Sequence, residues 1–274
     1  MLSVNTNTNA MTALEYLNNT QGQLAQVENA ISTGETVSSA KDNGAIFAIA
    51  QGMRGDVAGY TAVSQSLENG SSTVDVAMSA GQSISDLLIQ MKQQALSASD
   101  SSLDTQSRQA LNANFQALLQ QITTVVQNAQ FNGTNLIDGS TTQITALASA
   151  DGTHRITVAA ENMSLSGSIV TIASTGSIST QSKASTMVAT VESSLTNVDS
   201  ALATLGSGSA KFSIQATFVQ NLSDTLNTGI GNLVDANMAT ESAQLTALQT
   251  KQQLGVQALS IANQAPSIAL SLFH

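Results

Sequence analysis

The sequence predicts a mainly α-helical protein, built as a long antiparallel helical bundle and coiled coil with a small β-hairpin region in its middle. Apolar residues repeat at helical spacing near both ends, and an unusually long stripe of them runs from residue 46 to residue 95. β-Branched residues gather only between residues 131 and 180. Amphipathic helices at both extremities of a chain need a partner, either each other or another copy. This layout favours a self-assembling structural protein over an enzyme.

The N-terminal helix is predicted from a heptad pattern. Its apolar positions are spaced by three and four, which is the pattern of a coiled-coil seam. Gly34 follows the last of them and is suited to end the helix, because glycine readily adopts the left-handed conformation of a C-cap. A polar connector, residues 35–45, comes next. The seam positions are Ala10, Leu14, Leu17, Leu24 and Ile31, with the polar Gln21 and Glu28 in the two intervening slots.

The second helix has the strongest periodicity in the chain. From residue 46 to residue 95, positions alternating by three and four are apolar with the exceptions of Asp56, Gly70 and Gly81. A helix of roughly 50 residues would be about 75 Å long, whereas globular helices average about 11–12 residues. We therefore expect this stripe to be the core of a bundle. Its apolar members include Ile49, Val63, Leu67, Val74, Ala77, Ile84, Leu88, Met91 and Ala95.

The remaining helices are predicted from similar patterns. Asp104 can cap a helix that runs to about residue 130, and the short loop before it makes this helix antiparallel to its predecessor. Helical spacing returns at residue 181, where glycines 206 and 208 are expected to soften the helix. Ile214 and Phe218 resume the apolar stripe, and glycines 229 and 231 are expected to break it again before a last helix.

The middle of the chain is predicted to be β-rich. Asn132-Gly133 and Asp151-Gly152 are turn signals of the kind that joins antiparallel strands. Two β-branched runs, residues 155–158 and 169–172, are expected to be strands. The segment 131–180 is short, so the sheet is expected to be small and to form part of the bundle.

These elements predict a nested domain organisation. Residues 1–34 and 233–274 would form a coiled coil of the two ends, joined by the connectors 35–45 and 229–232 to a bundle of residues 46–130 and 181–228. Two isolated helices cannot bury every side of their apolar stripes. We therefore expect the termini to be largely disordered in a monomer and to become ordered when neighbouring subunits cover them.

Composition excludes several classes of function. Only 9% of the residues are charged and the net charge is −10, without a basic cluster. Nucleic acids and anionic membrane surfaces are therefore not expected as partners. The absence of cysteine removes disulfides, thiolate metal sites and cysteine nucleophiles. No apolar run is long enough for a membrane span, and the first ten residues lack the features of a secretory signal.

No constellation for catalysis, cofactor binding or metal binding is found. The two histidines are His154 and His274, and His154 is expected to lie in a surface loop. Neither the HExxH zinc motif nor the G-x-S-x-G serine motif occurs. Gly206-Ser207-Gly208 lacks the third glycine of a dinucleotide-binding loop. We therefore expect no enzymatic activity, no cofactor, no metal and no small-molecule substrate.

Three motifs in order resemble the signatures of bacterial flagellins. The N-terminal signature is matched by residues 31–34 (ISTG), 39–45 (SAKDNGA) and 48–50 (AIA). Residues 131–139 (FNGTNLIDG) resemble the family's helix-to-hairpin junction. Residues 249–264 (QTKQQLGVQALSIANQ) and the closing 270–273 (LSLF) resemble the C-terminal signature. The Asp42-Asn43-Gly44 variant is most similar to the short flagellins of alphaproteobacteria, the Caulobacter type.

The resemblance implies a secreted subunit that polymerises into the extracellular filament of the bacterial flagellum for swimming motility. It implies export in the unfolded state by the flagellar type III apparatus. The implied partners are other flagellin subunits, including paralogous flagellins, together with hook-associated and cap proteins and an export chaperone. A hook–filament junction protein of the same system is the alternative, because it shares the terminal coiled coil.

Subunit contacts are expected at the seams. Lys41 and Asp42 in the first connector are interpreted either as a solvated turn or as a spoke that contacts a neighbouring subunit. Asp235 and Glu241 are interpreted as cap residues of the last helix, or alternatively as partners of Lys251 across subunits. The predicted interface residues are Leu14, Leu17, Leu24, Ile31, Lys41, Asp42, Leu245, Leu248, Leu259 and Ile261.

Overall fold

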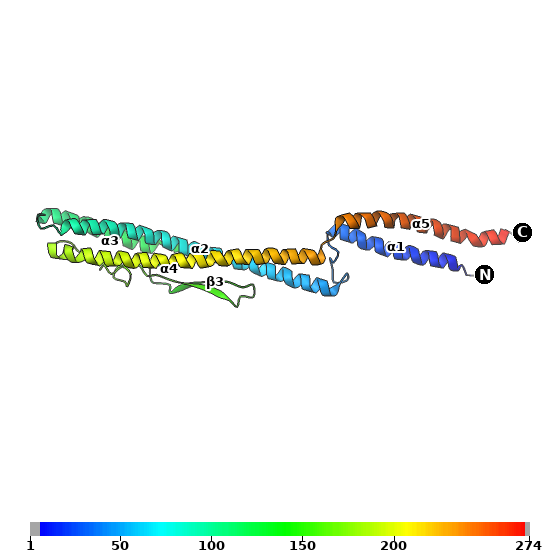
Figure 1. The fold of residues 1–274 in the computed structure, drawn as a ribbon, viewed down its shortest axis with the longest axis horizontal. Helices are drawn as coiled ribbons and strands as arrows, with labels where there is room; N and C mark the ends of the chain where they lie inside the picture. Colours follow the sequence, from blue (N-terminus) through cyan, green and yellow to red (C-terminus); the bar gives the residue numbers. More distant parts are fainter. Residues whose placement is uncertain (1–5, 272–274) are drawn as a thin grey trace. The chain divides into compact units, whose positions relative to one another are not determined.

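The computed structural model describes the backbone of residues 6–271 and the side chains of residues 6–264. Within that range the chain forms five helices and two small antiparallel sheets, which confirms the predicted mainly α-helical class (Figure 1). It divides into two compact units. One comprises residues up to Gly55 together with those from Thr225 onward, and the other comprises Asp56–Asp224. Leu272 and Phe273 of the C-terminal signature lie outside the described residues.

Gly34 and Asp104 end and begin helices as predicted, and Asn7 is a further cap that was not predicted. The Asn7 side chain accepts a hydrogen bond from the Ala10 N–H at the start of α1, and Gly34 ends that helix in the left-handed conformation with φ of 76°. Asp104 caps α3 by accepting a hydrogen bond from the Ser107 N–H. The helices are α1 (Thr8–Thr33), α2 (Gly44–Ala98), α3 (Thr105–Asn128), α4 (Gln181–Val234) and α5 (Met238–Ser271).

The core of the Asp56–Asp224 unit lies along the predicted stripe of α2. Eight of its apolar members are at most 1% exposed, namely Val63, Leu67, Val74, Ala77, Ile84, Leu88, Met91 and Ala95. Phe115 and Ile122 of α3 and Val191, Val198, Leu205 and Phe212 of α4 complete this core. The prediction of the stripe is wrong at its N-terminal end, because Ile49 is exposed and its neighbour Ala50 is buried.

The glycines of α4 do not interrupt it. α4 is a continuous helix from Gln181 to Val234, so the predicted softening near Gly208 and the predicted connector at 229–232 are wrong. Gly208 faces β4 closely, and an added Cβ would lie 2.5 Å from the Val158 side chain. Because the helix continues through Gly208, its buried face passes through Phe212 and Val219, while Ile214 and Phe218 are exposed.

The β region consists of two hairpins. β1 (Gln130–Phe131) pairs with β2 (Thr134–Asn135), and β3 (Gln143–Leu147) pairs with β4 (Arg155–Ala159). The turn between β3 and β4 forms at the predicted Asp151-Gly152, where the Gly152 N–H donates to the Ser149 carbonyl. Ala146 and Val158 point from this hairpin into the bundle core.

The predicted strand at residues 169–172 does not form. Val170 and Ile172 are buried in the core as a strand would bury them. Their backbone, however, finds its hydrogen bonds elsewhere. The Thr171 N–H donates to the Ser194 hydroxyl of α4, and the Ile169 carbonyl accepts from the Asn197 amide. The Val170 and Ile172 carbonyls accept from the backbone N–H groups of Gly167 and Ser166. The segment is therefore held by side chains of α4 and by the loop just before it rather than by another strand.

Candidate assembly interface

Helices α1 and α5 pack side by side in opposite directions (Figure 1). At one end the Asn7 side-chain amide donates to the Ala262 carbonyl at 2.7 Å. Further along, Leu17 packs against Gly255, where an added Cβ would lie 3.2 Å from the Leu17 side chain. Gly255 therefore allows the two helices to approach closely. Few of the side chains described up to residue 264 are buried between them, namely Leu17, Val27 and Ala30 on α1 and Leu248 on α5.

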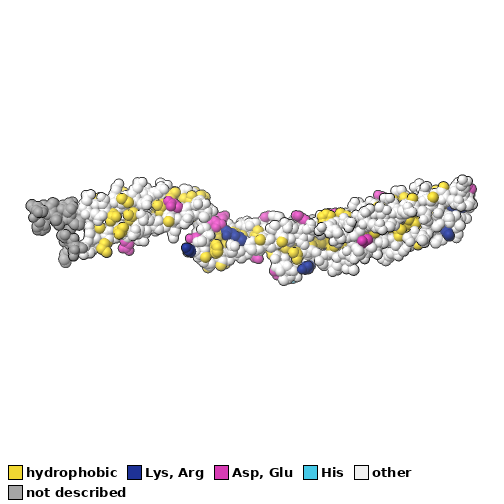
Figure 2. Space-filling view, turned by 180° about the vertical axis from the view of Figure 1, so that it is seen from behind, with side chains coloured by type: hydrophobic (Ala, Val, Ile, Leu, Met, Phe, Trp, Pro, Cys, Tyr) yellow, Lys and Arg dark blue, Asp and Glu magenta, His cyan; other side chains and the backbone are white. Residues whose placement is uncertain are grey.

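Both helices also carry large apolar side chains that this pairing leaves exposed. Their exposed fractions range from 44% for Met238 to 70% for Ile261. Figure 2 shows hydrophobic side chains on the surface of this part of the molecule. Such a surface is typical of an interaction site, because exposed apolar area is costly in water. Among the described residues, the exposed ones are Met11, Leu14 and Tyr16 on α1 and Met238, Leu254, Val256 and Ile261 on α5.

The predicted seam residues fall into three classes of exposure. Leu17 and Leu248 are buried between α1 and α5, whereas Leu14 and Ile261 face away from this pairing and are exposed. The other four, Leu24, Ile31, Leu245 and Leu259, are half-buried.

The buried face of α1 is shifted from the predicted one. Val27 and Ala30, which were not predicted, are buried, and Ala13 is half-buried. Residues 13, 17, 20, 24, 27 and 31 also alternate by four and three, and only Thr20 among them is polar. The predicted seam instead includes two polar positions, Gln21 and Glu28. Counting polar exceptions in both registers would have selected the observed face.

Residues 34–36, which follow α1, pair through their backbone with residues 234–236, which precede α5; this short antiparallel pairing is called the crossing below. Glu35 pairs with Asp235 as an isolated antiparallel bridge. The Thr36 N–H donates to the Val234 carbonyl at 2.7 Å, and the Ala236 N–H donates to the Gly34 carbonyl at 2.8 Å. Two segments about 200 residues apart in sequence are thereby held by backbone hydrogen bonds, each of which contributes roughly 1 kcal/mol.

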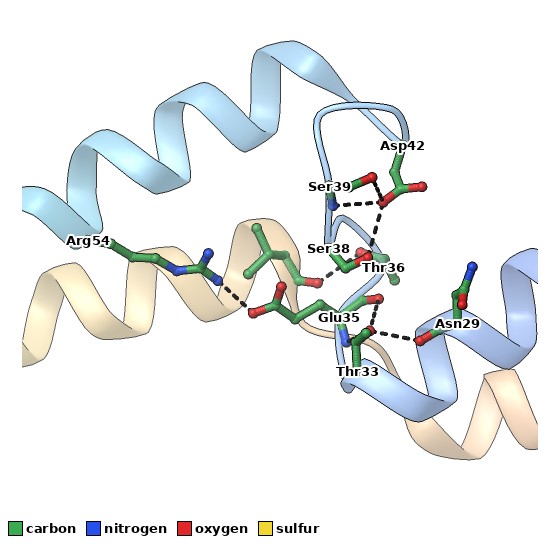
Figure 3. A network of polar contacts seen from close by, with 9 residues as sticks. Asn29, Thr33, Glu35, Thr36, Ser38, Ser39, Asp42 and Arg54 are labelled. Carbon is green, nitrogen blue, oxygen red and sulfur yellow. Dashed lines mark hydrogen bonds and ion pairs between the residues drawn. The ribbon is translucent and has the colours of Figure 1, made fainter.

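An ion pair strengthens this crossing. The Arg54 guanidinium lies 2.6 Å from the Glu35 carboxylate, and both side chains are partly shielded from solvent (Figure 3). Glu35 thus links the crossing to the first turns of α2. This ion pair was not predicted, because nothing in the sequence places Arg54 beside Glu35. Only the fold, which returns the chain after the connector, brings these two residues together.

Lys41 and Asp42 do not form an ion pair. The Asp42 carboxylate instead accepts hydrogen bonds from the Ser39 N–H at 2.9 Å and from the hydroxyls of Ser39 and Ser38 (Figure 3). These bonds, above all those from Ser39, hold the pKa of Asp42 below its usual range. The Lys41 ammonium has no ion-pair partner among the described residues. Asp42 therefore shapes the connector, and Lys41 is exposed.

Asp235 does not cap the last helix. The side chain of Asn237 accepts hydrogen bonds from the N–H groups of Ala239 and Thr240, so Asn237 is the N-cap of α5. Glu241 lies in the first turn of the helix, where a negative charge is favoured by the helix dipole. The cap interpretation is thus correct for Glu241 as a dipole complement and wrong for Asp235, which belongs to the crossing.

The helices of residues 6–271 do not combine the length and apolar character that a membrane span requires.

Comparison with known proteins then identifies the chain. Residues 4–142 match the family model described as the bacterial flagellin N-terminal helical region, and residues 188–273 match the bacterial flagellin C-terminal helical region. The chain shares the fold of a crystal structure of Bacillus cereus flagellin, at a TM-score of 0.50 and 19% identity over 56% of this chain and 88% of that one.

Curated relatives match over nearly the whole length. The chain is 49% identical to flagellin FljK and 48% identical to flagellin FljM of Caulobacter vibrioides, in each case over 99% of this chain and 98% of the relative. It is 36% identical to a flagellin of Brucella melitensis over the full length of both chains. Nothing in these comparisons favours a hook–filament junction protein. The chain belongs to the bacterial flagellin family and is of the short alphaproteobacterial type.

Proposed function

We propose that this flagellin builds the flagellar filament by covering the exposed apolar faces of α1 and α5 with the same helices of neighbouring subunits. The observation that supports this most directly is the exposure of Leu14, Leu254 and Ile261 beside a pairing that buries Leu17 and Leu248. Burying one such leucine or isoleucine contributes about 1.5–3 kcal/mol. Repeated along two helices and between many subunits, this gain drives assembly.

The two units serve different parts of the filament in this proposal. Helices α1 and α5 form the inner coiled coil around a central channel, and the Asp56–Asp224 unit forms the layer around it. The hairpins β1–β2 and β3–β4 lie at the place where longer flagellins carry an outer domain. A filament of this short chain is therefore thin and smooth, and its work is mechanical rather than catalytic.

The route to the filament follows from the family. We propose that the chain is exported unfolded by the flagellar type III apparatus with the help of a chaperone, and that it is added beneath a cap protein to a filament that starts on hook-associated proteins. Its location is then outside the cell. Lys41, exposed in the connector, remains a candidate contact with a neighbouring subunit, and Asp42 positions the turn that presents it.

A charge on the exposed face of α5 tests the interface. Leu254 and Ile261 are seven residues apart and share one face, about 120–140° around the helix from Leu248. Leu254→Asp places a carboxylate where the proposal buries an apolar side chain, so seeded polymerisation of purified subunits should fall at least tenfold. Electron microscopy after seeding measures filament number and length. Leu248→Asp is a poorer choice, because Leu248 is already buried against α1.

The matched control is Gln253→Asp, which adds the same charge at the preceding, exposed polar position. This variant should polymerise to within about threefold of the unmodified chain, because an exposed charge contributes little by itself. Circular dichroism should show that both variants keep the helical Asp56–Asp224 unit. Filaments of normal number and length from Leu254→Asp would refute the proposed interface.

A further inference from the structure

Three Asn-Gly pairs occur in the chain, Asn43-Gly44, Asn69-Gly70 and Asn132-Gly133. Such pairs are chemically labile, because a glycine leaves its own backbone nitrogen open to the preceding asparagine side chain. The structure places the three in different surroundings. We propose that Asn132 is a site of spontaneous deamidation in the folded protein, and that the fold protects Asn43 and Asn69 from the same reaction.

Asn132 and Gly133 form the whole two-residue loop between β1 and β2, since Phe131 pairs directly with Thr134. Both loop residues have positive φ, 48° for Asn132 and 79° for Gly133, as a type I′ turn requires. Both are exposed. A Cβ added at Gly133 would meet nothing within 4 Å. Among the described residues, neither the Asn132 amide nor the Gly133 N–H has a hydrogen-bond partner.

The reaction needs only these two residues and water. The Gly133 nitrogen loses its proton and attacks Cγ of Asn132, forming a new C–N bond and closing a five-membered succinimide. The bond between Cγ and the Asn132 amide nitrogen breaks, and that nitrogen leaves as ammonia after taking up a proton. Water then opens the ring at either carbonyl and yields aspartate or isoaspartate. No oxidation or reduction occurs.

The hydrogen bonds that Asn43 makes as a helix N-cap slow its deamidation. Its side-chain Oδ1 accepts hydrogen bonds from the N–H groups of Ala45 at 3.2 Å and Ile46 at 3.1 Å. Cyclisation would break both bonds, because Cγ must turn toward the Gly44 nitrogen. An N-cap interaction of this kind should slow the reaction roughly fivefold. The capped geometry therefore protects Asn43 although the residue is exposed.

Asn69 is protected by the helix around it. Asn69-Gly70 lies near the middle of α2, and its neighbour Leu67 is only 1% exposed. Gly70 itself faces the core, and a Cβ added there would lie 3.2 Å from the Phe212 ring. The succinimide ring cannot form on a helical backbone, so α2 must first open locally. We expect this opening to slow the reaction at Asn69 at least about a hundredfold.

Deamidation at Asn132 would change its surroundings in two ways. A groove of about 580 Å³ between α2 and the hairpins is lined by Asn132 and by Gln65, Asn69 and Gln143, with no charged residue. Aspartate at position 132 would introduce the first charge there. Isoaspartate would also add a methylene to the main chain of the turn. The β1–β2 hairpin ends in Asn135, which donates to the Val126 carbonyl at 2.7 Å and secures the end of α3.

Peptide mapping by mass spectrometry tests the proposal on the purified full-length chain. Samples are held at mildly alkaline pH, which favours loss of the nitrogen proton, and are digested at intervals. In the native protein the peptide with Asn132 should convert at least fivefold faster than the peptide with Asn43 and at least a hundredfold faster than that with Asn69. Asn132→Asp supplies the mass and charge standard for the aspartate product.

The same incubation in concentrated urea is the control, because it removes the fold and keeps the sequence. There the three peptides should convert at rates within about threefold of one another, which would show that the native difference arises from structure. Asn132→Gln should abolish conversion at this position and leave the other two rates unchanged. Equal native rates at Asn43 and Asn132, or a stable Asn132 in the native chain, would overturn the proposal.

Discussion

Glycine positions within the helices show how single residues determine close packing. Gly70 and Gly81 interrupt the apolar stripe of α2, yet both face the core. A Cβ on Gly81 would lie 2.7 Å from the Leu202 side chain, and one on Gly70 would lie 3.2 Å from the Phe212 ring. These exceptions in the pattern therefore mark points where side chains of α4 approach the backbone of α2 closely. A helical glycine costs about 1 kcal/mol relative to alanine, which close packing must offset.

Two glycines in one helix give a paired test of this argument. An alanine Cβ at Gly208 would lie 2.5 Å from the Val158 side chain, so Gly208→Ala must displace β4. We expect it to lower the free energy of unfolding by about 1–3 kcal/mol, as overpacked cores do. At Gly206 the nearest atom to an added Cβ is the Met78 sulfur at 4.0 Å. Gly206→Ala should therefore raise stability by about 0.5–1 kcal/mol.

Urea unfolding followed by circular dichroism measures both variants. The Asp56–Asp224 unit contains both positions, so the same transition reports them. If Gly206 and Gly208 were a flexible break in α4, both alanines would stabilise the helix equally. Opposite signs are expected only when the helix is continuous and Gly208 packs against the hairpin.

At the scale of elements, the turn of hairpin β3–β4 depends on one carboxylate. The Asp151 side chain accepts hydrogen bonds from the Ser149 hydroxyl and from the N–H and hydroxyl of Thr153. These bonds, the Ser149 hydroxyl first, lower the pKa of Asp151 from 3.8 to about 2. The folded form thus favours the ionised carboxylate, and the hairpin keeps this stabilisation above pH 3.8.

The stabilisation is lost as the pH falls from 3.8 through about 2, where Asp151 takes up a proton in the folded protein. An NMR titration of the side-chain carboxyl should give a pKa near 2 for Asp151. Ser149→Ala removes the largest cause and should move that pKa back toward 3.8. A Ser140→Ala variant, which alters the separate Asp138 turn, should leave the Asp151 titration in place. An unshifted Asp151 in the unmodified chain would show that the turn is open.

Local signals predicted the ends of elements well. Gly34, Asp104 and Asp151-Gly152 each act within a few residues, so their role could be inferred from the sequence. Features that depend on distant segments were missed. The run at 169–172 has strand composition, but its backbone bonds to the Ser194 and Asn197 side chains of α4 and to backbone N–H groups of residues 166 and 167. Gly208 was interpreted as a break, because the hairpin that fills the space beside it lies about 50 residues away in the sequence.

The candidate interface was predicted in part for the same reason. The existence of apolar stripes on the terminal helices is a local property, and Leu17 and Leu248 of these stripes are buried within the single chain. Which face of α1 meets α5 depends on packing, and a register of smaller residues, including Ala13 and Val27, forms that contact. The Glu35–Arg54 ion pair and the crossing at Asp235 required the fold.

At the scale of the whole molecule, burial is distributed unequally between the two units. The Asp56–Asp224 unit has a continuous core contributed by α2, α3, α4 and the hairpins. Between α1 and the part of α5 whose side chains are described, by contrast, the buried apolar side chains are Leu17, Val27, Ala30 and Leu248. Long helices supported by so few buried residues are marginal in water, because helical stability comes mainly from tertiary packing. Subunit contacts must therefore supply what the single chain lacks.

Hydrogen exchange measures this difference directly. In a dilute monomer, amides of α1 and α5 should exchange at least about a hundredfold faster than those around Leu88, because they open locally at low cost. Assembly into filaments should slow exchange in α1 and α5 by a similar factor while changing the Leu88 region little. The Leu254→Asp variant, kept under the same polymerising conditions, should retain the fast exchange of the monomer. A dilute monomer in which α1 and α5 are as protected as the Leu88 region would mean that the pair is stable by itself, and the energetic reason for polymerisation through these helices would be lost.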